Sequence, residues 1–292
     1  MTTYELSVVI AVAPGHPDLE PVLASVAASC SGLTTELLIV GESNAAVAET
    51  TANLTVRRIP SAPGTLVPVA WGLGIAIAQG EIIACLSSEF TVRSDWLPTL
   101  IAAVREGAVG AAGAIEIAAG AGATTAAMYF LRFSPFLPRA AAAAMVNNIP
   151  GDGALYRRDK IVQHPDLLAQ GFWEIVFHQR WLATGEQLRF DPAPLVTYHG
   201  PAGLRDGAVL RYRHGVTYGS TMVLRHGNSR MRHILGAPLL PLVLCARIAR
   251  RVVTAGKGVA TLLRALPPLL VLTGAWSLGE ATGAAQPGRG ES

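Results

Sequence analysis

The sequence predicts an α/β fold in which buried strands alternate with helices around a largely parallel sheet. Short apolar, β-branched runs recur along the first part of the chain, and helical patterns bounded by turn residues separate them. The run Ile82–Leu86 then ends abruptly in the polar side chains Ser87, Ser88 and Glu89. A buried parallel strand has this pattern, and open α/β sheets bind ligands beyond the carboxyl ends of their strands.

The first elements follow one another in β-α-β-α-β order. The predicted strands are Leu6–Ala13, Glu36–Val40, Thr55–Ile59 and the focal run Ile82–Leu86. Pro14–Pro17 closes the first strand, and Asp18 is predicted to cap a helix from about Leu19 to Ala28. A second helix, from about Val69 to Gln79, leads into the focal strand. This order implies right-handed crossovers and a sheet of the nucleotide-binding type.

Later elements are shorter and less regular. Asp95 is predicted to cap a helix over Trp96–Arg105, and an Ala/Gly loop is expected after a possible strand over Gly110–Ile117. The other predicted segments are the linker Ala140–Ala144, a strand after the turn Gly151–Gly153, the helix Gly171–Gly185, and the strands Leu188–Phe190 and Leu195–Tyr198. From these patterns we expect three parts: a domain over 1–204, a basic helical connector over 205–233, and apolar segments with a polar tail over 234–292.

Composition excludes some classes of protein. The formal charge of +3 is too small to indicate nucleic acid as a partner, although arginine is concentrated between Arg205 and Arg264. Three cysteines, Cys30, Cys85 and Cys245, lie far apart in apolar surroundings, which predicts reduced core thiols. The opening residues lack the basic region of a signal peptide, so we expect the body of the protein in the cytoplasm.

The C-terminal region contains two apolar segments, Ile234–Ala246 and Leu266–Leu278, each 13 residues long. Both are short for a transmembrane helix, and Arg247, Arg250 and Arg251 lie between them. This pattern predicts an interfacial or re-entrant hairpin on an anionic leaflet, which would place the protein at the cytoplasmic face of the cell membrane. A buried helical subdomain or a dimer interface is the alternative.

Two short motifs suggest other chemistry and are rejected. Tyr156 and Lys160 have the Tyr-x-x-x-Lys spacing of short-chain dehydrogenases, but the turn after the first strand has one glycine and two prolines. Gly256-Lys257-Gly258 lacks the rest of a phosphate-binding loop. Zinc-type clusters of cysteine and histidine are also missing.

An ordered series of segments resembles the family 2 glycosyltransferases, enzymes of GT-A type that use nucleotide sugars. The resemblance runs from Leu6 to about Arg213, roughly the first 70% of the chain. Its segments are Leu6–Ala13, Glu36–Val40, Gly80–Ala84, Asp95–Leu97, Gly171–Glu174 with Phe177–Arg180 and Gly185, Asp191-Pro192, and Tyr198-His199. The resemblance implies a GT-A type, Rossmann-like mixed sheet flanked by helices. The apolar segments beyond Ile234 add a helical extension at the C-terminus.

The implied reaction moves a sugar from a nucleotide diphosphate-sugar to a hydroxyl group with inversion, in envelope polysaccharide or glycolipid synthesis. The implied partners are the donor and a lipid-linked or polysaccharide acceptor, and the C-terminal segments add the membrane surface as a partner. Two departures matter: Gly41-Glu42 replaces the usual acidic pair, and Ser87-Ser88-Glu89 replaces three acidic positions. They leave open the alternative of a non-catalytic protein of this type that binds a nucleotide or a partner enzyme.

The resemblance also implies roles for individual residues. Donor-site residues would be Ala13, Glu42, Ser87, Ser88 and Glu89, and acceptor-side residues would be Asp152 and Trp173. The alternatives are a plain loop carboxylate for Glu89, hydrogen bonds within the loop for the two serines, and an Asx-turn for Asp152. Glu89 would hold Mg²⁺ or Mn²⁺, ions commonly bound by one or two carboxylates together with phosphates and waters.

The candidate base is Glu174, whose apolar surroundings predict a raised pKa. A solvated helix glutamate is the alternative. His178, one helical turn later, either orients this base or makes a structural hydrogen bond. Arg211, Arg213 and His214 would neutralise the diphosphate or an anionic lipid, unless they only form a solvated basic face.

Overall fold

The computed structural model describes residues 4–13, 15–16, 18–30, 32–43, 54–200, 203–224 and 229–286. Pro14, Pro17, Asn44 and the polar tail beyond Gln286 lie outside the described residues. The chain forms two compact units. The first comprises Met1–Glu116 and Pro138–His199, and the second comprises Ile117–Leu137 and Gly200–Ser292. The division therefore differs from the expected boundary at 204, since Ile117–Leu137 groups with the C-terminal helices.

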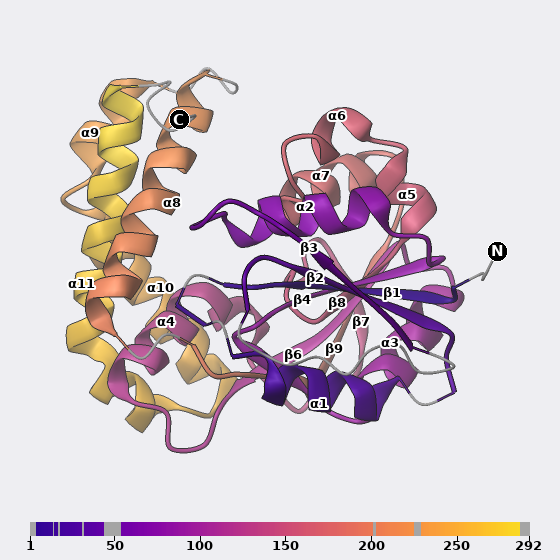
Figure 1. The fold of residues 1–292 in the computed structure, drawn as a ribbon. Helices are drawn as coiled ribbons and strands as arrows, with labels where there is room; N and C mark the ends of the chain where they lie inside the picture. The colour runs from indigo at the N-terminus through magenta and orange to yellow at the C-terminus, as the bar shows by residue number, and fades with distance from the viewer. Residues whose placement is uncertain are drawn as a thin grey trace. The chain divides into compact units, whose positions relative to one another are not determined.

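A mixed sheet forms the centre of the first unit (Figure 1). Its nine described strands are β1 Leu6–Ala11, β2 Thr35–Val40, β3 Leu54–Ile59, β4 Ile82–Ser87, β5 Phe90–Val92, β6 Gly110–Ile117, β7 Ala144–Val146, β8 Ala154–Arg157 and β9 Leu188–Tyr198. Their order is β3-β2-β1-β4-β8-β6-β9-β5, with β7 paired to β9. The four strands from β3 to β4 are parallel, and β8 is antiparallel to β4. The predicted fold class is confirmed.

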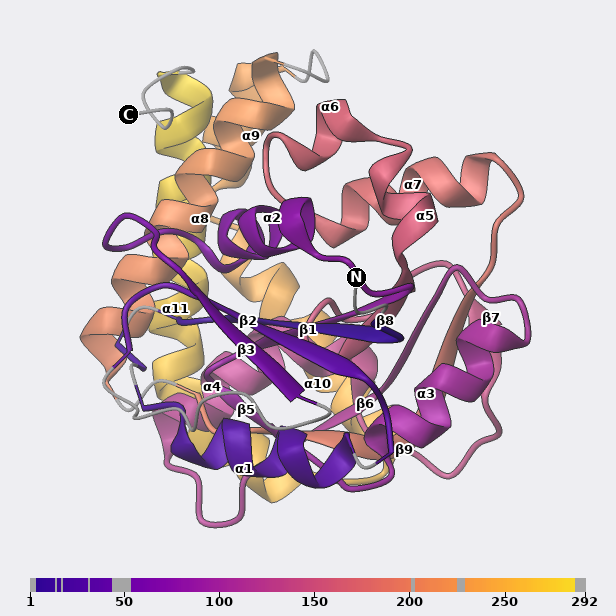
Figure 2. The same cartoon turned by 45° about the vertical axis from the view of Figure 1, so that its right-hand side comes forward.

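Helices cover both faces of this sheet. They are α1 Glu20–Ser29, α2 Val67–Ile77, α3 Trp96–Arg105, α5 Arg158–Val162, α6 Pro165–Leu168 and α7 Glu174–Ala183. Helices α1 and α3 lie on one face, whereas α2 and α5 to α7 lie on the other (Figures 1 and 2). Because both faces are covered, every residue of β1, β2 and β4 is buried, which explains their continuous apolar runs.

One buried carboxylate interrupts this apolar core. Glu36 on β2 is fully buried, and the Ser7 hydroxyl donates to its Oε1 at 2.6 Å. The backbone N–H of Gln79 donates to the same oxygen, and Arg57 forms an ion pair with Oε2 at 3.6 Å. These partners on β1, β3 and the turn before β4 compensate the buried charge, so Glu36 ties the parallel strands together.

Several local predictions were wrong at the level of partners or boundaries. Asp95 makes no side-chain capping bond to α3, because its carboxylate pairs with Arg93 at 3.1 Å. Leu188–Phe190 and Leu195–Tyr198 form one continuous strand, β9, and the linker Ala140–Ala144 runs into strand β7. Part of the expected Ala/Gly loop belongs to helix α4.

The second unit is helical. Its helices are α4 Ala123–Phe133, a short 3-10 turn at Ser134–Phe136, α8 Leu204–Leu224, α9 Arg230–Gly236, α10 Leu240–Ala255 and α11 Val259–Ala285. Helices α8 and α11 run side by side (Figure 1). A Cβ atom placed on Gly279 or Gly283 of α11 would lie 2.2 Å from the Tyr212 carbonyl oxygen or 2.0 Å from the Val216 carbonyl oxygen. The two backbones therefore touch.

The apolar C-terminal segments are longer than predicted. Leu266–Leu278 belongs to α11, a helix of 27 residues that continues through Pro267 and Pro268. Among the described residues, α11 is the one helix that is long and apolar enough to cross a bilayer by itself. The other apolar segment is divided between α9 and α10, which meet at a bend of 73°.

Candidate active site

The predicted donor residues meet at the carboxyl edge of the parallel strands. Ala11 at the end of β1 is in register with Val40 of β2 and Ser87 of β4. The residues that follow these strand ends, Ala13, Glu42, Ser88 and Glu89, therefore leave the sheet at the same edge. Glu42 is exposed there, whereas Ser87, Ser88 and Glu89 are buried. The structure brings this predicted set together at the edge where α/β sheets bind ligands.

The two serines make different contacts. The Ser88 Oγ accepts a hydrogen bond from the Ala13 N–H at 2.9 Å, and the Ser88 N–H donates to the Ala11 carbonyl at 2.9 Å. Ser88 thus joins the ends of β1 and β4. The Ser87 side chain is fully buried, and its Oγ has no hydrogen-bond partner among the described residues.

Glu89 is held inside the first unit. Only 4% of the residue is exposed, and the Tyr198 hydroxyl donates to Glu89 Oε1 at 3.4 Å. The His199 N–H donates to the Glu89 carbonyl at 2.8 Å, and the Phe90 ring packs on Tyr198 with 5.1 Å between centroids. The described residues contain no group of three or more histidine, cysteine or acidic side chains suited to a metal ion. A cation at Glu89 would therefore take most of its ligands from phosphates and waters.

Two histidines that were not predicted as site residues also lie at this edge. His16 follows β1, and His199 follows β9, whose end pairs with β5 beside Glu89. The His199 Nε2 lies 2.9 Å from the Thr91 Oγ1. Partial burial, and then the nearby His16, lower the pKa of His199. Their positions were the available signal: His16 lies in the turn segment after β1, and His199 directly follows β9.

The predicted Gly-Asp-Gly turn packs against the end of β4. The Gly153 N–H donates to the Cys85 carbonyl at 2.8 Å, and the Trp96 Nε1–H donates to the Gly153 carbonyl at 2.8 Å. Gly153 has a φ of +74°, a conformation that favours glycine. These contacts place Asp152, which is 4% exposed, beside the focal strand.

Glu174, the first residue of α7, also lies at the Gly151–Gly153 turn. A Cβ atom on Gly151 would lie 3.0 Å from the Glu174 Cδ and 2.9 Å from the Trp71 ring, so the carboxyl group packs on the Gly151 backbone. Trp71 in turn donates its Nε1–H to the Leu86 carbonyl of β4 at 2.8 Å. The charges of Asp152 and Glu174, after burial, raise the pKa of the Cys85 thiol. Two carboxylates therefore converge beyond the end of the focal strand.

His178 makes buried hydrogen bonds. Its Nδ1 lies 2.7 Å from the Asn148 Oδ1, and its Nε2 lies 3.1 Å from the Tyr156 hydroxyl. Burial lowers the pKa of His178 to about 3, so the ring is neutral at physiological pH. An amide oxygen only accepts, hence Nδ1 carries the proton and Nε2 accepts from Tyr156. His178 thus links α7 to β8 and to the loop before it. These are structural hydrogen bonds, one of the two roles that the sequence left open for His178.

Stability should fall below neutral pH because of His178. Its pKa is lower in the folded chain than in the unfolded chain, so the unfolded chain binds the extra proton as pH falls below about 6.5. The stabilisation present above that pH is lost progressively as the pH falls towards the pKa of His178 in the folded chain. We expect a loss of about 2 kcal/mol between about pH 6.5 and about pH 5. Urea unfolding at several pH values measures it, and His178→Gln should remove this contribution; an unchanged pH slope would contradict the assignment.

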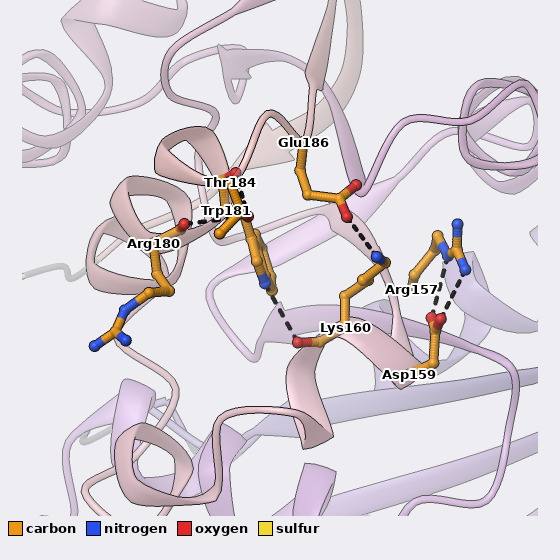
Figure 3. Close-up of polar contacts among 7 residues, drawn as sticks. All are labelled: Arg157, Asp159, Lys160, Arg180, Trp181, Thr184 and Glu186. Carbon is orange, nitrogen blue, oxygen red and sulfur yellow. Dashed lines mark hydrogen bonds and ion pairs between the residues drawn. The ribbon is translucent and has the colours of Figure 1, made fainter.

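Lys160 has a structural partner (Figure 3). Its ammonium group pairs with Glu186, and its carbonyl accepts from the Trp181 Nε1–H at 3.3 Å. Arg157 pairs with Asp159 at 2.7 Å on the same segment. The hydroxyl of Tyr156 instead contacts His178, so Tyr156 and Lys160 do not form a dehydrogenase-type pair.

An open groove of about 480 Å³ runs beside α7. It is lined by Asn147, Asn148, Ile175, His178, Gln179 and Leu182. The predicted acceptor-side residue Trp173 precedes the helix and donates its Nε1–H to the Gln170 carbonyl at 3.0 Å. The groove therefore presents amides and apolar groups and no charged side chain.

The predicted basic residues lie in the second unit. Arg211 is buried, with its guanidinium 5.3 Å from the centroid of the Trp276 ring and hydrogen-bonded to His214. Burial, and then Arg211 and Arg132, lower the pKa of His214 to about 2. Of the three residues, only Arg213 is exposed. Arg211 and His214 thus contact one another inside this unit.

No family model matches the chain, and no curated protein matches its sequence. Solved structures do match. TarS residues 1–349 from S. aureus in complex with UDP-GlcNAc has a TM-score of 0.51 and 11% sequence identity, covering 94% of this chain and 90% of that one. The same protein in complex with UDP has a TM-score of 0.50 at the same identity and coverage. The chain therefore shares its fold, a mixed sheet flanked by helices, with proteins of known structure.

Proposed function

We propose that the first unit transfers a sugar from a nucleotide diphosphate-sugar to a hydroxyl acceptor, with inversion. The observation that carries the proposal is the packing of Glu174 on Gly151, which holds a carboxylate beyond the end of β4. Ligands of α/β sheets bind at this edge. A structure of the same fold contains UDP-GlcNAc, which supports a uridine diphosphate-sugar as the donor.

Glu174 acts as the general base in this proposal. Its carboxylate takes the proton of the acceptor hydroxyl while that oxygen forms a bond to the anomeric carbon. The bond between that carbon and the diphosphate oxygen breaks, and the electron pair leaves with the diphosphate. Attack opposite to the leaving group inverts the anomeric centre. The bonds from His178 to Tyr156 and Asn148 fix α7, and so position Glu174 at its first turn.

The leaving diphosphate carries negative charge that the carboxyl edge must accommodate. His16, His199 and the Ser87 hydroxyl supply candidate donors from this chain. Dependence on Mg²⁺ or Mn²⁺, with Glu89 as the contributing carboxylate, stays a prediction, and no step is assigned to the ion.

The acceptor is proposed to enter along the groove beside α7. Three amide side chains, Asn147, Asn148 and Gln179, offer paired donors and acceptors, which suit neighbouring sugar hydroxyls. The absence of charged side chains among its lining residues favours a neutral glycan portion. An acceptor in envelope polysaccharide or glycolipid synthesis has this chemistry.

Donor binding and turnover test the proposal. Among a panel of nucleotide sugars, uridine diphosphate-sugars should raise Tm by roughly 5–10 °C at about a hundred times Kd. Turnover is then followed with candidate glycan acceptors, in parallel with Mn²⁺ and with a chelator. Failure of every nucleotide sugar to bind would contradict the proposal.

A non-catalytic binding protein is the second candidate, favoured by the burial of Glu89 and by Ser87 and Ser88 at positions where the resemblance implies acidic residues. A wild-type protein that binds a donor but neither hydrolyses nor transfers its sugar with any acceptor pool would establish this second candidate.

A further inference from the structure

The second unit exposes large apolar side chains on α9, α10 and α11. We define the leucine surface as Leu235, Leu239, Leu242, Leu263, Leu270 and Leu278, whose exposed fractions range from 47% to 69%. On α11 the three leucines are spaced by seven and eight residues, two helical turns each, so they share one face. The opposite side of α11 is buried, including Leu262, Leu269 and Leu272. The exposed leucines therefore form a stripe along the outer side of the helix.

The charge around the leucine surface is strongly one-sided. Residues 207–279 contain ten lysine and arginine residues and no aspartate or glutamate. Arg247 and Arg250 are exposed on α10, and Arg264 is exposed on α11 next to Leu263. Burial, followed by Arg247 and Arg250, lowers the pKa of Arg251, as expected where cations crowd together without a counter-charge. A second copy with the same positive charge would be repelled, whereas an anionic surface would be attracted.

The packing of α11 indicates whether this helix lies on a bilayer or crosses it. Its glycines Gly279 and Gly283 contact the backbone of α8 directly. Helix α8 carries exposed Arg205, Asp206 and Arg213. A membrane-spanning α11 would either draw these charges towards the hydrocarbon or lose its closest partner, and both are unfavourable. A helix lying in the interface keeps the contact with α8 and still buries its leucines.

We propose that α9, α10 and α11 dock on the surface of an anionic phospholipid bilayer without crossing it. The leucine surface enters the boundary between headgroups and acyl chains, and the arginines contact the lipid phosphates. This docking is independent of the proposed transfer reaction, because it uses only residues of the second unit.

Vesicle flotation tests the proposal with the full chain. Binding to equimolar phosphatidylcholine–phosphatidylglycerol vesicles should exceed binding to phosphatidylcholine vesicles by at least about tenfold and should weaken with salt. The double variant Leu263→Gln/Leu270→Gln should lower binding by roughly tenfold to a hundredfold. The matched control Met145→Gln/Val162→Gln alters two exposed apolar residues of the first unit, 52% and 39% exposed, and should leave binding unchanged.

A charge variant provides a second readout that does not depend on the leucines. Arg247→Gln/Arg250→Gln should weaken binding to the anionic vesicles by roughly 25-fold, because each basic residue near the surface contributes about fivefold. Circular dichroism spectra matching wild type confirm that each variant is folded. Equal binding to neutral and anionic vesicles, or no binding to either, would overturn the proposal.

Extraction of cell membranes separates docking from spanning. Alkaline carbonate should release the wild-type protein, as expected for a surface-bound chain. Retention in the carbonate pellet would overturn the surface placement in favour of a spanning α11. A wild-type dimer that the leucine substitutions dissociate, combined with no vesicle binding, would assign the leucine surface to a second copy instead.

Discussion

Replacing Glu174 with glutamine should lower kcat for sugar transfer by about a hundredfold to ten-thousandfold, while the donor Kd changes little. Glutamine keeps the size of the side chain, so packing on Gly151 beside Trp71 is retained and only the proton acceptor is lost. The loss should appear in kcat because the base acts on the acceptor hydroxyl during bond formation. Steady-state transfer assays and calorimetric donor binding measure the two quantities separately.

Glu186 offers a matched control for this substitution. It follows α7, as Glu174 begins it, and its carboxylate pairs with Lys160 (Figure 3). Lys160 comes soon after Arg157, which pairs with Ile82 at the opposite end of β4. Glu186→Gln should therefore leave kcat nearly unchanged. Asp152→Asn tests the neighbouring carboxylate. If Asp152→Asn abolished transfer and Glu174→Gln did not, the base would be Asp152 and the proposed assignment would be wrong.

Local patterns were sufficient to predict the four parallel strands of the first unit, whereas strands β5 and β7 were not predicted. β1, β2 and β4 contain continuous apolar runs because helices cover both faces of the sheet, and turn residues mark where each strand ends. The focal run Ile82–Leu86 corresponds to strand β4, extended by Ser87. Its polar end does lie at the same edge as the ends of β1 and β2.

Partners distant in sequence could not be predicted in this way. Glu36 opens a predicted buried strand, and no nearby residue in the sequence indicates what compensates its charge. The structure buries Glu36 between Ser7 and Arg57, which lie on two neighbouring strands. Which neighbour satisfies a polar group depends on tertiary packing that no short window of sequence contains.

Contacts between distant residues of the candidate site could not be predicted from the sequence either. The position of Glu174 at the start of a helix was close to the prediction, but its contact with Gly151 joins two distant segments. Glu89 accepts from Tyr198, 109 residues away in sequence, and this bond holds its side chain inside the first unit. His16 and His199 become neighbours only when the sheet forms, so the resemblance at Tyr198-His199 did not predict this pair.

The double variant Gly279→Ala/Gly283→Ala should lower the free energy of unfolding of the second unit by about 3 kcal/mol. Each added Cβ would lie 2.2 Å or 2.0 Å from a carbonyl oxygen of α8, a contact that backbone atoms cannot relieve by changing a rotamer. Helices α8 and α11 must therefore separate, which weakens their small-residue packing along the whole interface. Urea unfolding followed by circular dichroism measures the loss.

Gly274 is the matched control on the same helix. A Cβ there has no atom within 4 Å, so Gly274→Ala should raise stability by up to about 1 kcal/mol through helix propensity alone. If the free energy of unfolding falls in Gly279→Ala/Gly283→Ala and rises in Gly274→Ala, the close backbone contact causes the destabilisation, and not the loss of glycine as such. Equal effects would contradict the packing argument.

The variant Gly279→Ala/Gly283→Ala also tests why α11 is expected to lie on the bilayer surface. The contact with α8 is the reason that α11 is expected to lie on a bilayer, although its length and hydropathy allow it to cross one. Once α8 no longer holds it, α11 loses the charged neighbour that opposes insertion. We therefore expect Gly279→Ala/Gly283→Ala to increase the fraction of protein that alkaline carbonate fails to release, whereas Gly274→Ala should not. Complete release of the glycine variant would show that α8 is not what keeps α11 at the surface.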